Sequence, residues 1–78
     1  MLFSEKIKEL LLDKGYMIVN SAGDQCAMKR TKNKTSLLIR PNQDQTFTIY
    51  LSQVEGVENE SFRSESIDLI LEFGDNYF

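Results

Sequence analysis

The chain has 78 residues, with 9 basic and 12 acidic side chains, one cysteine and no histidine. This length favours a single domain spanning residues 1–78, and one cysteine excludes an intrachain disulfide. Without histidine the chain lacks the commonest general base and the usual zinc ligands, so we expect no enzyme, no metal and no cofactor. No signal-peptide pattern opens the chain, and its longest aliphatic run, at residues 10–12, is too short to cross a membrane. We therefore expect a cytoplasmic protein.

The first half of the chain predicts a helix followed by short strands. Ser4 is a typical N-cap, and apolar residues recur at helical spacing as far as Gly15, which predicts a helix over residues 4–14. Residues 16–19 favour a strand, and residues 25–31 predict another, with Cys26 as a small buried apolar side chain. Residues 35–40 form a clearer strand that ends at Pro41.

The second half predicts one strand and one helix. Alternation is cleanest over residues 46–52, and an acidic connection over residues 54–60 then leads to a helix that begins near Ser61 or Ser64 and ends before Gly74. We therefore predict a two-layer α+β fold with an N-terminal helix, an antiparallel meander of three to four strands and a C-terminal helix. The residues expected to share one core are Phe3, Ile7, Leu10, Phe47, Ile49, Leu51, Ile67 and Ile70.

Charge is divided unevenly along the chain. Residues 1–40 carry eight basic and four acidic side chains, whereas residues 41–78 carry eight acidic side chains and only Arg63 as a base. An acidic surface keeps a protein soluble, and it also attracts a basic cleft that normally holds nucleic-acid phosphates. A basic cluster over residues 29–34 leaves open a second interpretation, an RNA-binding module, although the acidic C-terminal helix would repel phosphates.

One segment resembles a known family. The stretch from Leu37 to Asp44, continuing into Phe47-Thr48-Ile49, resembles the central hairpin of a phage anti-CRISPR family, and Lys14-Gly15-Tyr16 matches the start of that family's first strand. Members of this family inhibit the DNA-cutting nuclease of type II CRISPR systems. This chain has Gln45 where the family has a glycine. The resemblance implies a DNA-mimicking inhibitor in which Asp44, with Asn42 beside it, contacts the nuclease.

Together these observations predict a phage-encoded, non-enzymatic inhibitor that binds a host CRISPR nuclease, or another DNA-handling enzyme, through an acidic surface. We expect a monomer or small homo-oligomer with no membrane contact and no direct nucleic-acid contact. An immunity or antitoxin protein that neutralises a cognate toxin needs the same surface and remains an alternative. The candidate partner-binding residues are Asn42, Asp44, Glu55, Glu58, Glu60, Glu65 and Asp68.

Overall fold

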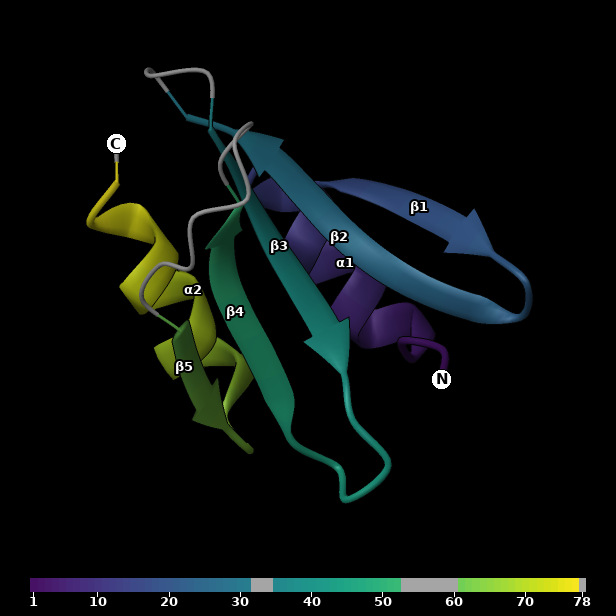
Figure 1. Ribbon diagram of the computed structural model, residues 1–78. Helices are drawn as coiled ribbons and strands as arrows, with labels where there is room; N and C mark the ends of the chain where they lie inside the picture. The colour runs from purple at the N-terminus through teal and green to yellow at the C-terminus, as the bar shows by residue number, and fades with distance from the viewer. Residues whose placement is uncertain (32–34, 53–60, 78) are drawn as a thin grey trace.

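The computed structural model describes residues 1–31, 35–52 and 61–77, and within them the chain forms an α+β fold (Figure 1). The elements are α1 (Glu5–Asp13), β1 (Met17–Ser21), β2 (Asp24–Arg30), β3 (Ser36–Pro41), β4 (Phe47–Ser52), β5 (Ser61–Ser64) and α2 (Ile67–Asp75). The strands pair antiparallel with their neighbours in chain order, from β1 to β5. The predicted fold class is confirmed, although the described residues hold five strands rather than three to four.

The N-terminal helix begins and ends where local chemistry predicts. Ser4 Oγ accepts a hydrogen bond from the Ile7 amide at 3.2 Å, which satisfies one of the free donors of the first turn. After Asp13 the chain leaves the helix through Gly15, whose φ of +87° lies in the left-handed region that glycine adopts at little cost.

Both helices pack against the same face of the sheet (Figure 1). Ala27, Ile39 and Ile49 are cross-strand neighbours on that face, and they are fully buried with Leu11 of α1 and Ile70 of α2. The opposite face, which we call the open face, carries no helix within the described part of the chain. The expected core residues all belong to this cluster or pack against it.

The start of the C-terminal helix differs from the prediction. Residues 61–64 form β5, and Phe62 lies opposite Ile49 of β4 on the covered face. Its ring stacks on Phe73 with centroids 5.4 Å apart. Pairing with β4 and this ring contact therefore stabilise the extended conformation of residues 61–64. The helix begins only at Ile67, after Ser66, whose Oγ accepts from the Leu69 amide at 3.3 Å.

The end of this helix also differs from the prediction. Gly74 lies inside α2, which ends at Asp75, and it is buried. A Cβ atom at position 74 would lie 2.5 Å from the Tyr16 hydroxyl oxygen and 3.1 Å from Ile49 Cδ1. Gly74 therefore allows α2 to approach the sheet closely and does not stop the helix.

In the described ranges, neither helix is long and apolar enough to cross a bilayer.

Candidate partner-binding site

The hairpin between β3 and β4 holds two of the predicted binding residues, and its own hydrogen bonds occupy both of them. The side-chain amide of Asn42 donates to Thr46 Oγ1 at 3.0 Å and to Thr48 Oγ1 at 2.8 Å. Asn42 is half-buried, so its side chain shapes the turn. A partner would have to compete with these two bonds to use the Asn42 amide.

Asp44 is also engaged within the molecule. Its carboxylate accepts hydrogen bonds from the Thr46 amide and hydroxyl and forms an ion pair with Arg63 of β5. The hydrogen bond from the Thr46 hydroxyl has the largest effect in holding the pKa of Asp44 below its usual value. Desolvation opposes it, and the Thr46 amide and Arg63 lower this pKa to a smaller extent. Asp44 is half-exposed, but Arg63 compensates its negative charge.

Gln45, the departure from the family pattern, has a φ of +67°. Few residues other than glycine, asparagine and aspartate adopt this left-handed backbone. The turn therefore has the backbone geometry that a glycine would suit, although the side chain present is glutamine.

Among the described residues of this half of the chain, the acidic side chains without an ion-pair partner lie on α2 or just before it. Glu65, Asp68 and Glu72 are exposed and form no ion pair with any described residue. Asp68, Leu69 and Glu72 lie on the same outer side of α2 because these positions recur at helical spacing, whereas Glu65 precedes the N-cap residue Ser66. Asp75 differs, since it pairs with Lys14 at 3.6 Å.

The structure brings two predicted parts of the site to one end of the molecule. The Asp44 hairpin and the first turn of α2 lie at the same end of the sheet (Figure 1), and the ion pair of Asp44 with Arg63 joins the hairpin to β5, the strand that leads into α2. Glu65 and Asp68 flank that end, and Glu72 continues the acidic side along α2. Glu72 was not among the predicted site residues, although it is four residues after Asp68 and therefore lies on the same side of the helix.

The other three predicted carboxylates, Glu55, Glu58 and Glu60, lie outside the described residues. Among the residues that the structure describes, no three Asp, Glu, His or Cys side chains gather as metal ligands would.

The two described bases of the basic cluster, Lys29 and Arg30, lie on opposite faces of the sheet. Lys29 lies opposite the buried Leu37, and its ammonium group donates to the Lys14 carbonyl oxygen at 2.7 Å and lies 5.6 Å from the centre of the Tyr16 ring. The next residue, Arg30, is exposed and points to the open face because side chains alternate along a strand. Lys29 and Arg30 therefore do not form one phosphate clamp.

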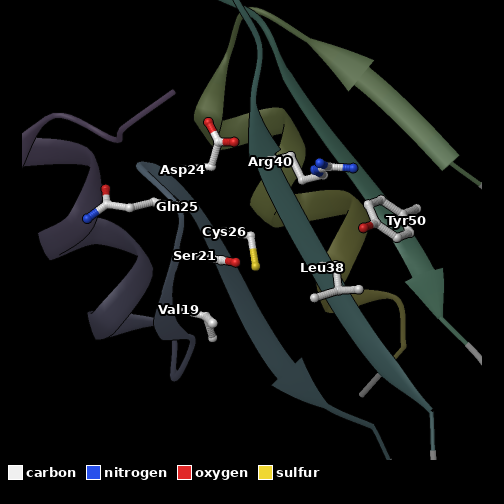
Figure 2. Close-up of a pocket in the computed structure, with 8 residues that line it drawn as sticks. All are labelled: Val19, Ser21, Asp24, Gln25, Cys26, Leu38, Arg40 and Tyr50. Atoms are coloured by element: carbon white, nitrogen blue, oxygen red, sulfur yellow. The ribbon is translucent and has the colours of Figure 1, made fainter.

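A shallow groove of about 350 Å³ on the open face was not predicted (Figure 2). Its apolar walls are Val19, Cys26 and Leu38, and Arg40 and Tyr50 lie on the adjoining strands. The expectation that Cys26 is buried is wrong, because its side chain lies on the open face and is partly exposed. Alternation places Cys26 and Met28 on one side of β2, but only the packing of the helices decides that this side stays open.

Comparison of the chain with protein families, curated proteins and solved structures found no match.

Proposed function

We propose that this protein is a non-enzymatic inhibitor that occupies a basic, nucleic-acid-binding cleft of a partner protein with the outer side of α2. The observation that carries the proposal is the row of exposed carboxylates at Glu65, Asp68 and Glu72. Asp44 is compensated by Arg63 and Asp75 pairs with Lys14, but these three carboxylates have no ion-pair partner among the described residues. Their charge is therefore available to a partner.

The spacing of these carboxylates supports a cleft built for phosphates. Asp68 and Glu72 are four residues apart on a helix, a separation of about 6 Å along its axis. Phosphates on one DNA strand follow one another at about 3.4 Å of axial rise, so the separation of these two carboxylates is close to two phosphate steps. Lysine and arginine side chains placed to hold phosphates can reach such carboxylates, and arginine binds them bidentately.

We propose the DNA-cutting nuclease of a type II CRISPR system as the first partner to test, because of the resemblance of the β3–β4 hairpin. In this narrower proposal the chain is a phage-encoded anti-CRISPR protein. Asp44 and Asn42 would hold the hairpin in shape beside α2, consistent with their internal hydrogen bonds.

The test uses a charge-neutralised variant and a matched control. Glu65→Gln/Asp68→Asn/Glu72→Gln should bind the guide-loaded nuclease at least about tenfold more weakly, mainly through slower association. The control Glu5→Gln/Glu9→Gln/Asp13→Asn removes the same charge from α1 and should keep near-native affinity. Both variants are checked for folding by circular dichroism, and inhibition is measured by DNA cleavage.

Competition with DNA decides the mechanism. Nuclease preloaded with target DNA should no longer accept this protein. Equal affinity for free and DNA-loaded nuclease, or equal binding by the two triple variants, would contradict occupancy of the DNA cleft by α2. If the α2 variant instead loses neutralisation of a toxin encoded beside this gene, the antitoxin alternative replaces the CRISPR target.

A further inference from the structure

An apolar band crosses the open face of the sheet. Met17 lies opposite Met28, Met28 opposite Leu38, and Leu38 opposite Tyr50 on successive strands from β1 to β4. Met17 is 56% exposed, and the other three are partly exposed. An antiparallel sheet with one face toward water usually places polar residues at such positions, so this band is unusual.

Arginines flank the band on both sides. The chain has three arginines, Arg30, Arg40 and Arg63, and alternation places all of them on the open face. On one side of the band, Arg30 lies opposite Ser36. On the other side, Arg40 and Arg63 both lie opposite Thr48, one on each neighbouring strand. Arg30 and Arg40 form no ion pair with a described residue.

The nearby carboxylates leave this surface positive. Asp24 lines the same groove, but the Met1 amino group forms an ion pair with it, and that contact lowers the pKa of Asp24. Asp44 is already paired with Arg63. A ligand for the open face must therefore carry negative groups beside an apolar one.

The outer side of α2 has this composition. Leu69 is 48% exposed, although it belongs to a helix with an apolar inner side. Along the helix axis, Leu69 lies between Asp68 and Glu72, and Glu65 precedes the helix on the Asp68 side. An apolar centre flanked by carboxylates is the complement of an apolar band flanked by arginines.

The spacings of the two surfaces also agree. Arg40 lies four residues along β3 from Ser36, the register partner of Arg30, which separates the two arginines by about 13 Å along the strand. Glu65 and Glu72 are separated by on the order of 10–14 Å, since Ser66 before the helix is extended and the helix rises about 1.5 Å per residue. Leu38 lies near the middle between the two arginines, and Leu69 lies near the middle between Glu65 and Glu72.

We propose that the open face binds the outer side of α2 from a second copy of this chain. Leu69 of one copy enters the groove beside Leu38 of the other, and carboxylates of that helix pair with Arg30 and Arg40. The donating and receiving surfaces lie on opposite layers of the fold, so the contact is head-to-tail and each copy can make it twice.

The surface chemistry favours a polypeptide over a nucleic acid. Single-stranded nucleic acid binds on rows of aromatic side chains, and among the described strand residues Tyr50 is the aromatic side chain on the open face. Methionine and leucine instead form adaptable surfaces for protein side chains.

Sedimentation of the full-length protein tests this contact. The average mass should rise above 9.0 kDa as the concentration increases from about 10 µM to about 1 mM, the range of a weak interface. Arg40→Glu blocks the receiving face, and Glu65→Lys/Glu72→Lys blocks the donating helix, so each variant alone should stay monomeric. An equimolar mixture should form a one-to-one dimer, because each variant retains the surface that the other lacks.

Two controls separate this contact from a general charge effect. Lys6→Glu makes the same charge change as Arg40→Glu on the exposed side of α1 and should associate like the unmodified protein. Leu69→Ala should weaken association at least about tenfold without a change in charge. Arg40→Glu should still bind the partner of the proposed function through α2, so failure of one proposal does not imply failure of the other.

Three results would overturn the proposal. The unmodified protein could remain monomeric at about 1 mM, or the mixture of variants could remain monomeric while the unmodified protein associates. Tight binding of a 20-nucleotide single-stranded RNA, lost in Arg40→Glu, would make nucleic acid the occupant of the open face.

Discussion

On the covered face of the sheet, Leu37, Ile39 and Ile49 are fully buried beneath the two helices of the described chain, whereas Met28 and Leu38 remain partly exposed on the open face. Leu37 and Leu38 are adjacent residues of the same strand, so their different burial comes only from which side the helices cover. In β3, therefore, the apolar character of a side chain does not by itself show that it belongs to the core. On the open face it marks a surface that another polypeptide can cover.

The largest expected effect compares these two neighbours directly. Leu37→Ala should lower the free energy of unfolding by about 2–5 kcal/mol, because it leaves a cavity in the core. Leu38→Ala should cost about 1 kcal/mol or less, since its side chain already contacts water. Urea denaturation measures both. Equal losses of stability would contradict this assignment, because they would show that the two faces are packed alike.

A second expected effect concerns the close approach of α2 to the covered face. Gly74→Ala should destabilise the protein by about 1–3 kcal/mol, although alanine favours a helix, because the new methyl group meets the Tyr16 hydroxyl and Ile49. The same change in a Tyr16→Phe background should cost less, since the nearest atom is gone. Thermal melts of the four proteins in this cycle measure the coupling. Identical costs in the two backgrounds would contradict the close contact.

Tyr16 also predicts a pH effect on the covered face. Burial, with a smaller effect of Asp75, raises the pKa of Tyr16 from 10.0 to about 12. The unfolded chain loses this proton first, so stability should fall as the pH rises from about 10 to about 12, by about 1 kcal/mol at pH 11. Urea denaturation across this range measures the slope, which Tyr16→Phe should reduce. An unchanged slope in that variant would assign the effect to other groups.

Asp44 predicts a smaller pH effect of opposite direction at the edge of the open face. Its folded-state pKa lies below the unfolded value, so its contribution is present above pH 4 and is lost as the pH falls through the folded pKa. Asp44→Asn should flatten the fall in stability between pH 5 and pH 2. Arg63→Gln should flatten it less, because Thr46 has the larger effect on this carboxyl group. Parallel curves for all three proteins would contradict the assignment.

The elements that the sequence predicts well are those decided by neighbouring residues. The Ser4 cap, the helical spacing up to Leu11 and the left-handed Gly15 are all local, so the start and end of α1 follow from them. The alternation in β4 likewise places Ile49 in the core. Hydrogen bonds within one turn and the two-residue alternation of a strand depend only on neighbouring residues, so they can be predicted without the rest of the fold.

The candidate site was predictable only in part. Glu65 and Asp68 are at exposed positions, as their charge predicts, but the ion pair that compensates Asp44 comes from Arg63, 19 residues further along the chain. The sequence composition shows that a carboxylate is present, but it does not show whether the fold places a cation beside it. In the same way, the order of residues along the chain does not show that Lys29 and Arg30, which are adjacent in the basic cluster, point to opposite faces of the sheet.

By itself the sequence determined the fold class, the first helix, the strand alternation and the uneven division of charge, because each depends on residues close together in the chain. Only the tertiary structure decided that residues 61–64 form a strand, that Gly74 lies within α2 and that Cys26 is on the open face. These outcomes depend on contacts between distant segments. Both sides of β2 and β3 carry apolar residues, so local patterns cannot tell which side the helices will cover.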